Sequence, residues 1–529
     1  LFKLARYAKK RLDKEGTWEW VYKVEHEVLR VCIQAEIDGM PMDLDLLKSK
    51  QEVLNPVVED LKNRIHELAG DWDFKPSSTS DLPRVIFGDM RVPPPVFEIR
   101  TINGHDYHLP NTNKWGKEYC TENNFIPDCR KPDDMPAEFR ERGLSTSKVT
   151  LELLEHPIGQ AVLDWRVADK LRSTYLESMI PILEATDDSV IHARFKSIGA
   201  KATGRFSIVN PNLQTLPSRG KGREYDERVQ RFGPTLRETF VAPPPDEEFP
   251  EGYSLVISDL SQIELRLIAH QTKDKKLLEV YNEYVTVEDQ THYTGDIHLA
   301  TQTSMNVPRK AAKALNFGMC YGVGGAKFAR MNCMLIPGTS LYDVDTANEY
   351  KRGFFHTYQG IESYTNNLKV AWYDGQRNFP MLSGRYRHWL FDRVAPSKIL
   401  NSQIQGSASD ILKLQIAAFN RHVVPLYPGL RFALQVHDEL AYICPNKYIE
   451  EVSWLVKYVM EFPFMNLRVP LLAGAKICKS WACAADDNVP EVGVQFARIN
   501  GEDKLFDEHN WEEFVAADEA GIIELKGAA

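Results

Sequence analysis

The sequence predicts an α+β protein with several domains, and three observations support this fold class. Residues 1 to about 70 have a helical apolar period, residues 255–268 read as a strand that passes into a helix, and residues 432–444 read as two apolar strands joined by a turn. The chain has 529 residues, of which 43% are hydrophobic, and this is ample for two to four packed domains.

Helices dominate the first 70 residues. The apolar side of a first helix is formed by Leu29, Val31, Cys32, Ile33 and Ile37. A break is expected at Asp38-Gly39-Met40-Pro41. A long amphipathic helix should follow Met42 and Asp43, with an apolar face made by Leu54, Val58, Leu61 and Ile65.

Residues 88–144 differ from the segments around them. They are rich in proline, asparagine, aspartate and glycine, and they show no clear period. We therefore expect a surface insertion here.

Asp259 lies at the point where a predicted strand gives way to a predicted helix. Leu255, Val256 and Ile257 form the apolar strand, and apolar residues recur on a helical period from Ile263 onward. A carboxylate on a rigid strand end suits a divalent cation, because its position is fixed while other oxygen ligands remain available. The alternative is an aspartate that serves only as a helix N-cap.

A second acidic element lies at the tip of the predicted hairpin. The strands of FALQVHDELAYIC meet at His437, Asp438 and Glu439. A strand end and a hairpin tip can place Asp259 and Asp438 on adjoining strands. Two such carboxylates can hold two Mg²⁺ about 3.5–4 Å apart, which is the chemistry of phosphoryl or nucleotidyl transfer.

A third element is a predicted helix between these two. Pro308 suits its first turn, and glycines at 322, 324 and 325 end it. One stripe along it is formed by Arg309, Lys313, Phe317 and Tyr321. Two cations followed by two aromatics suit a triphosphate on the first half and a sugar, base or template strand on the second. The alternative is a partly buried helix with a solvated basic end.

Charge, hydropathy and cysteine content limit the classes of protein to which this chain can belong. The net charge of −10 neither indicates nor excludes a nucleic-acid binder, because a local basic groove decides that affinity. No signal peptide or membrane-spanning run is found, so no membrane partner is expected and the predicted location is the cytoplasm, of a host cell if the protein is viral. The eight scattered cysteines are expected to be reduced, buried thiols.

The three elements resemble motifs A, B and C of the family A DNA polymerases, the DNA polymerase I-like group that includes many bacteriophage replicases. DLSQIELR resembles the family's DYSQIELR, RKAAKALNFGMCYG matches its R-x-x-x-K-x-x-x-F/Y-x-x-x-Y-G helix, and VHDEL is its motif C. The resemblance implies a template-directed DNA polymerase of bacteriophage type that acts in viral DNA replication, with a right-hand fold.

This resemblance also implies a domain order. The thumb would span 1–190 with the insertion at 88–144, the palm 191–266 and 393–481, the fingers 267–392, and an acidic C-terminal extension 482–529. The segment KLRSTY at 170–175 resembles the end of the thumb, whose basic residues face phosphate. No exonuclease activity is expected of this chain, because the family's exonuclease precedes the thumb.

Residue roles follow from the same resemblance. The catalytic set would be Asp259, Asp438, Glu439 and Lys313, with two Mg²⁺ (or Mn²⁺ as a substitute) held by Asp259, Asp438 and the Leu260 backbone carbonyl. The incoming nucleotide would meet Arg309, Lys313, Phe317, Tyr321, His298, Glu264 and Arg219. The DNA would meet Arg205, Asn401, Gln405 and His437.

Two positions imply how nucleotides are selected. Glu264 holds the family's steric-gate position, where it would collide with a 2′-OH, so deoxynucleotides should be preferred. Phe317, where some phage enzymes have tyrosine, implies discrimination against dideoxynucleotides. Ser397 stands where the family usually has arginine, which leaves one contact to DNA in doubt.

The implied partners are primer–template DNA and dNTPs, with a processivity factor or replisome protein as a further partner through the insertion or the extension. For the insertion, a clamp on DNA is the other alternative. Two other functions stay open: a non-catalytic duplex-binding protein derived from a polymerase, and a single-subunit RNA polymerase, against which Glu264 and QVHDEL argue.

Overall fold

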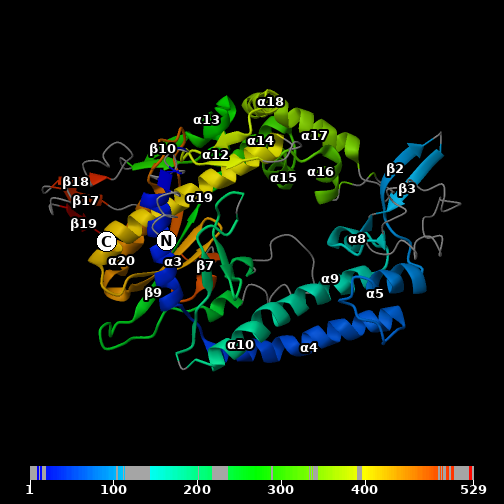
Figure 1. Cartoon of the computed structure of the whole chain (residues 1–529), viewed down its shortest axis with the longest axis horizontal. Helices are drawn as coiled ribbons and strands as arrows, with labels where there is room; N and C mark the ends of the chain where they lie inside the picture. Colours follow the sequence, from blue (N-terminus) through cyan, green and yellow to red (C-terminus); the bar gives the residue numbers. More distant parts are fainter. Residues whose placement is uncertain are drawn as a thin grey trace.

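A computed structural model of the chain describes residues 20–102, 105–110, 112–113, 143–186, 188–200, 202–216, 236–287, 290–332, 343–389, 396–485, 496–499, 502–505 and 523–526, together with single residues near these ranges. A long helical arm runs along the bottom of Figure 1, and a β-hairpin lies beyond its far end. The other helices surround a sheet at the opposite side. Within the described residues, no helix combines the length and the apolar character needed to cross a bilayer.

The sheet is antiparallel, with four strands in the order β14-β15-β9-β16. In that order the strands span Arg431–Val436, Glu439–Pro445, Tyr253–Leu260 and Ala473–Cys478. The first six residues of β9 are buried between its two neighbours, which confirms the predicted buried strand. Only two residues separate β9 from α12 (Ile263–Thr272), as the pattern of apolar residues predicts.

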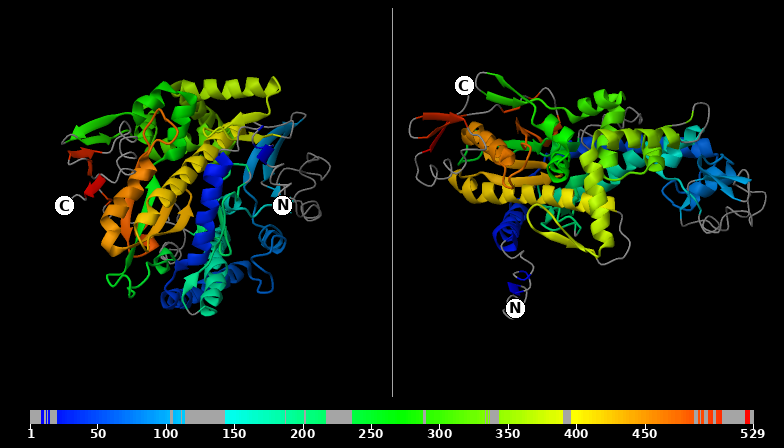
Figure 2. Two further views of the ribbon diagram at one scale, coloured as in Figure 1. Left: turned by 60° about the vertical axis from the view of Figure 1, so that its left-hand side comes forward. Right: turned by 90° about the horizontal axis from the view of Figure 1, so that it is seen from above.

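Four helices pack around this sheet. Helix α20 (Ile449–Glu461) packs on β9 and β16. The longest helix, α19 (Pro396–His422), contacts α12, α20 and α3 (His26–Asp38). Figure 2 shows α3 and α19 side by side. Segments from the beginning, middle and end of the chain therefore share one core.

A group of helices packs against α12 and α19 (Figure 1). These helices are α13 (Lys275–Tyr281), α14 (Ile297–Met305), α15 (Arg309–Cys320), α16 (Gly325–Met331), α17 (Val344–Thr357) and α18 (Gln359–Tyr373). Helix α15 packs on α14 and on α17. Two hairpins belong to this part of the chain: β10 (Tyr284–Val287) with β11 (Gln290–Tyr293), and β12 (Asn378–Pro380) with β13 (Tyr386–His388).

The arm consists of α4 (Leu44–Ala69) packed along α9 (Pro157–Lys170), with α10 (Glu177–Glu184) near the start of α4. Asp43 caps α4 by accepting a hydrogen bond from the Leu46 backbone N–H at 2.8 Å. The predicted apolar face is confirmed, because all four of its residues are buried: Leu54, Val58, Leu61 and Ile65.

The insertion contains two antiparallel pairs among its described residues. β2 (Val96–Ile102) pairs with β3 (His105–Pro110), and β4 (Thr112–Asn113) pairs with β5 (Gly143–Leu144). The helices beside it are α5 (Asp81–Pro83) and α8 (Lys148–Glu152). The sequence pattern did not predict these strands.

Short elements complete the described part of the chain. The pairs are β1 (Met40–Pro41) with β6 (Val190–Ile191) and β7 (Arg194–Lys196) with β8 (Ser207–Val209). Three π-helical segments span Val21–Glu25, Arg84–Asp89 and Leu171–Leu176. The 3₁₀ turns span Leu213–Thr215, Leu236–Thr239, Val424–Leu426, Asn446–Tyr448 and Trp481–Ala485.

The C-terminal extension contains a small sheet of order β18-β17-β19, with strands Glu502–Leu505, Phe496–Ile499 and Ile523–Lys526. The expectation of reduced cysteines was wrong for one pair, since Cys478 at the end of β16 is bonded to Cys483. It is confirmed for Cys32, Cys320 and Cys444, which are free and buried.

Candidate active site

Two carboxylates meet at one end of the sheet. Asp259 lies on β9, and Asp438 lies in the two-residue turn between β14 and β15. Its neighbour in that turn, His437, has φ +58°. The turn is tied to β9 because the Leu260 N–H donates to the Asp438 carbonyl oxygen at 3.2 Å. The hairpin and the adjoining strand therefore arise as predicted.

Asp259 does not act as a helix cap. The N-cap of α12 is Gln262, and its side chain makes no capping hydrogen bond. Asp259 instead pairs across the sheet with Glu439 on one side and Gly474 on the other. The Asp259 carboxylate therefore lies at the end of the sheet, where Asp438 also lies.

The electrostatics of this pair disfavour two negative charges. Asp259 keeps access to solvent, but desolvation by the crowded protein around it, followed by repulsion from Asp438 and Glu439, raises its pKa to about 8. Arg237 opposes this rise. Burial also raises the pKa of Asp438. A site that brings two carboxyls together in this way is prepared for a cation.

Glu439 faces a different set of partners. Its carboxylate accepts a hydrogen bond from Trp481 Nε1 at 2.6 Å and lies 3.9 Å from the Arg237 guanidinium, which stacks on the same indole at 4.1 Å. Burial raises the Glu439 pKa. Sequence reasoning missed Arg237, because it lies in a 3₁₀ turn outside all three motifs and only the fold brings it to the carboxylates.

Helix α15 carries the predicted stripe on its outer face. Arg309, Lys313 and Phe317 are exposed and Tyr321 is half-buried. The opposite face packs inward through Ala312, Leu315, Asn316 and Met319. Arg309 Nη2 donates to the Asp296 carboxylate at 2.7 Å. That carboxylate also caps α14 through the N–H groups of residues 298 and 299, so it joins the start of α15 to the start of α14.

His298 lies on α14 against the same stripe. Its ring centroid is 5.8 Å from that of Phe317, and its Nδ1 is 2.9 Å from the Asn316 side-chain nitrogen. Burial, together with the charges of Lys313 and Arg309, lowers the His298 pKa, although Asp296 opposes this. These effects favour the neutral imidazole.

Glu264 joins the stripe to the sheet end. Its carboxylate accepts hydrogen bonds from the Tyr321 hydroxyl and from the Arg205 guanidinium. Three segments that are far apart in the sequence meet at this one side chain. Its charge also raises the pKa of Asp438, so Glu264 belongs to the same electrostatic site as the carboxylate pair.

The remaining predicted residues lie in three different places. Asn401 and Gln405 lie one turn apart on α19, both half-buried, and the Asn401 side-chain oxygen is buried without a hydrogen-bond partner in the described structure. The His437 side chain is exposed in the hairpin turn. Arg219 lies outside the described residues.

Ser397 has a role that the sequence did not reveal. A Cβ added to Gly322, just after α15, would lie 2.2 Å from the Ser397 Cβ at the start of α19. Gly322 also has φ +70°, a conformation that residues with side chains rarely adopt. The two helices can therefore meet here only because residue 322 is glycine.

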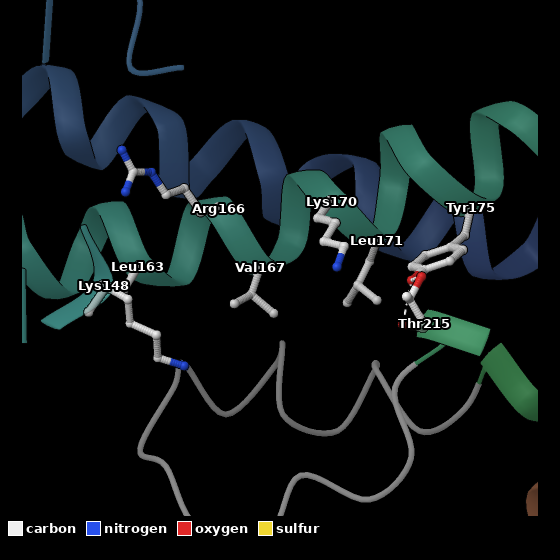
Figure 3. A pocket seen from close by; sticks show the side chains of 8 residues that line it. All are labelled: Lys148, Leu163, Arg166, Val167, Lys170, Leu171, Tyr175 and Thr215. Carbon is white, nitrogen blue, oxygen red and sulfur yellow. Dashed lines mark hydrogen bonds between the residues drawn. The ribbon is translucent and has the colours of Figure 1, made fainter. Parts of the chain in front are cut away.

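A separate cavity of about 320 Å³, lined by apolar and basic residues, lies beside the arm (Figure 3). Its lining residues are Lys148, Leu163, Arg166, Val167, Lys170, Leu171, Tyr175 and Thr215. The Arg166 guanidinium donates to the Thr146 carbonyl oxygen at 2.6 Å, and the Tyr175 hydroxyl donates to the Thr215 carbonyl oxygen at 2.5 Å. The cavity includes the basic end of the KLRSTY segment but none of the carboxylate pair.

Comparison with known proteins places this arrangement in a family. Residues 128–483 match the model for "DNA polymerase family A". A thermostable DNA polymerase I of Thermus thermophilus is 28% identical over 496 residues, which cover 92% of this chain and 51% of the relative. DNA polymerase I of Helicobacter pylori is 27% identical over 496 residues, which cover 91% and 46%. The chain spans about half the length of these relatives.

A solved structure has the same fold. It is the POL domain of Pol1 from M. smegmatis in complex with DNA primer-template and dNTP, with a TM-score of 0.70 and 23% identity, covering 92% of this chain and 75% of that one. The right-hand α+β fold is thereby confirmed. The relatives named here are bacterial, so the bacteriophage source stays a prediction.

Proposed function

The chain belongs to DNA polymerase family A, and from this premise we propose that it is a DNA-directed DNA polymerase, which adds deoxynucleotides to a primer 3′-OH as a template directs. The observation that carries the proposal is the meeting of Asp259 and Asp438 at the end of the sheet, which Glu264 connects to Tyr321 at the end of the α15 stripe. The POL domain with the similar fold was solved with primer-template and dNTP, and this agrees with the proposed substrates.

The carboxylate pair fits Mg²⁺. Asp259 and Asp438 offer the oxygen ligands that this ion prefers. Desolvation and then repulsion raise the Asp259 pKa, and a divalent cation bound to both side chains would offset both effects. Within the described residues, no group of three or more His, Cys, Asp or Glu side chains could hold a metal ion. The proposed site therefore relies on this pair, on the Leu260 carbonyl, and on substrate oxygens and water. Ions held by Asp259 and Asp438 would supply positive charge for activation of the primer 3′-oxygen and for departure of the pyrophosphate.

The stripe would bind the incoming nucleotide. Arg309 and Lys313 project from the exposed face of the first turns of α15, where their charges can balance a triphosphate. Phe317 and Tyr321 follow along the same face and offer flat surfaces for the sugar and the templating base. When the helix approaches the sheet with a correct pair in place, the cations arrive together with the substrate, so pairing is coupled to reaction.

Glu264 would act as the gate against ribonucleotides. Its carboxylate is fixed between Tyr321 and Arg205, so it cannot turn aside easily when a 2′-OH approaches. Arg205, Asn401, Gln405 and His437 would contact the DNA. The acceptors of the minor groove are common to all correct pairs, so hydrogen-bond donors there can test pair geometry without reading sequence.

The domains would follow the expected order. The arm of α4, α9 and α10 would be the thumb, the four-stranded sheet with α19 and α20 the palm, and α13 to α18 the fingers. Action in DNA replication, in a virus or in a cell, and a processivity partner for the insertion or the C-terminal extension belong to the same proposal.

Primer extension tests this function. The wild-type chain should extend a labelled primer on a DNA template with Mg²⁺ and dNTPs. Asp259→Ala should lose at least about a hundredfold in rate, because it removes charge stabilisation at the reacting centre, while fluorescence anisotropy should show unchanged DNA affinity. Asp343→Asn, at the cap of α17, is the matched control and should leave the rate unchanged. A wild-type chain that binds DNA but never extends it would point instead to the non-catalytic alternative.

A further inference from the structure

A chain of buried polar side chains links α14, α15 and the start of α18. The Tyr358 hydroxyl lies 2.6 Å from Thr301 Oγ1, and Thr301 Oγ1 lies 2.8 Å from Asn316 Oδ1. The Asn316 nitrogen in turn lies 2.9 Å from His298 Nδ1. All four side chains are buried. The network therefore ends at the imidazole beside the proposed nucleotide site.

The orientation of the Asn316 amide is fixed by its surroundings. One of its two terminal atoms lies 3.2 Å from the Ile297 backbone oxygen, which can only accept a hydrogen bond. That atom must be the NH₂ nitrogen, because a carbonyl oxygen there would face another oxygen without a hydrogen between them. The other terminal atom, the oxygen, then meets the Thr301 hydroxyl.

This orientation decides the tautomer of His298. The Asn316 nitrogen is a donor only, so His298 Nδ1 must accept its hydrogen bond. A neutral imidazole has one N–H, which must then be on Nε2. Burial and the charges of Lys313 and Arg309, which lower the His298 pKa, agree with a neutral ring.

We propose that Asn316 is a positioning residue that holds His298 as the neutral Nε2–H tautomer and so presents its single N–H donor to a phosphate oxygen of the incoming nucleotide. The nucleotide part rests on the proposed function, whereas the tautomer part does not. Phe317 supports the placement, since its ring lies against the imidazole on the stripe that also carries Lys313. A ring with its proton on Nδ1 would offer the phosphate a lone pair instead of a donor.

The tautomer can be read directly from ¹⁵N-histidine NMR of the full chain, with His298→Gln used to assign the signal. The wild type should show the Nε2–H pattern. Asn316→Leu, which keeps the approximate volume but removes the amide, should show an Nδ1–H or mixed pattern. Tyr358→Phe removes the other end of the network and is the matched control, with no expected change. A wild-type Nδ1–H pattern, or an unchanged pattern in Asn316→Leu, overturns the proposal.

If near-UV circular dichroism shows that Asn316→Leu does not fold, Asn316→Asp provides a second test of the tautomer. A carboxylate accepts hydrogen bonds, so it should draw the proton onto Nδ1. Persistence of the Nε2–H pattern in that variant also overturns the proposal.

A double-mutant cycle tests the nucleotide part. His298→Leu, which has no donor, and Asn316→Leu should each raise KM for dNTP about tenfold, the loss expected for one hydrogen bond to a charged group, and leave kcat nearly unchanged. Because Asn316 acts through His298, the KM of the double variant should also be raised only about tenfold. A KM raised about a hundredfold would mean that the two residues act independently and would overturn the proposal.

The two experiments separate this inference from the proposed function. An active enzyme that lacks the Nε2–H tautomer refutes the role of Asn316 alone. A folded wild-type chain that has the tautomer but extends no primer refutes the proposed function and the nucleotide part with it.

Discussion

The carboxylate of Glu264 on α12 accepts a hydrogen bond from the hydroxyl of Tyr321, the residue that follows α15. These residues are 57 positions apart, and their contact joins the end of the stripe to the helix that follows the central strand. Since the Arg205 guanidinium holds the same carboxylate from another segment, Glu264 is fixed in place by two partners.

Removing this side chain should relax sugar selection. We expect Glu264→Ala to lower the preference for dNTP over NTP about a hundredfold, because the variant lacks the side chain whose bulk and charge exclude a 2′-OH. The ratio of kcat/KM for dNTP and NTP in single-nucleotide extension measures this. Tyr321→Phe keeps the carboxylate but frees it from one partner, and it should have a smaller effect. An unchanged ratio in Glu264→Ala would remove the gate from the proposal.

A buried ion pair should make a large contribution to stability. Lys413 Nζ on α19 lies 2.7 and 2.9 Å from the two carboxylate oxygens of Glu25, and the Lys413 side chain is fully buried. Lys413→Met should lower the free energy of unfolding by about 3–5 kcal/mol, because it leaves the Glu25 charge buried without its partner. Urea denaturation measures the loss. The double variant with Glu25→Gln should recover part of it, and a double variant no more stable than Lys413→Met would contradict the explanation.

Stability should fall in mild acid through His270. Burial first, and then Arg468 and Lys273, hold the pKa of His270 below its ordinary 6.5, while its Nδ1 accepts a hydrogen bond from the Arg468 N–H at 3.1 Å. The unfolded chain therefore binds this proton more readily than the folded one. The stabilisation is fully present above pH 6.5 and is lost as the pH falls through the folded pKa.

Urea midpoints at pH 7.5 and 5.5 test this sign. The midpoint should be lower at pH 5.5 for the wild type, and the difference should shrink in His270→Gln, whose side-chain oxygen can still accept the Arg468 N–H. His298 also has a lowered pKa, so His298→Gln is the matched comparison and should shrink the difference in the same direction. An equal difference in all three proteins would show that neither histidine carries it.

The join between α15 and α19 should not tolerate a side chain on Gly322. Gly322→Ala places a Cβ in the positive-φ region and against Ser397, and we expect a loss of about 1–3 kcal/mol in the free energy of unfolding. Gly324→Ala is the matched control, because an added Cβ there meets no atom within 4 Å. Ser397→Gly should partly rescue Gly322→Ala. Equal stability of the two alanine variants would contradict the proposed clash.

Local sequence patterns predicted the elements that carry the site. The apolar run before Asp259, the helical period after Ile263 and the two apolar runs on either side of Asp438 were sufficient for a strand, a helix and a hairpin, since each depends on neighbours in sequence. The period of four in α15 also placed Arg309 and Phe317 on one exposed face. These predictions concern residues whose partners are close along the chain.

Contacts between distant segments could not be predicted in this way. The pairing of Asp259 with Glu439 depends on strand register, and the tie between Asn316 and His298 depends on how two helices pack. The bond between Cys478 and Cys483 was missed because the pair lacks the usual motif spacing. In each case the deciding quantity is a distance in space that local periodicity does not contain.

The close approach of Gly322 and Ser397 also gives α15 a fulcrum. The helix has 12 residues, so Arg309 lies about 18 Å from the end that rests on α19. With that end fixed, a rotation of about 10° would carry the guanidinium about 3 Å while Tyr321 barely moved. The lever arm would thus convert a small tilt into the making or breaking of a phosphate contact at the far end, and the aromatic end would keep its place against Glu264.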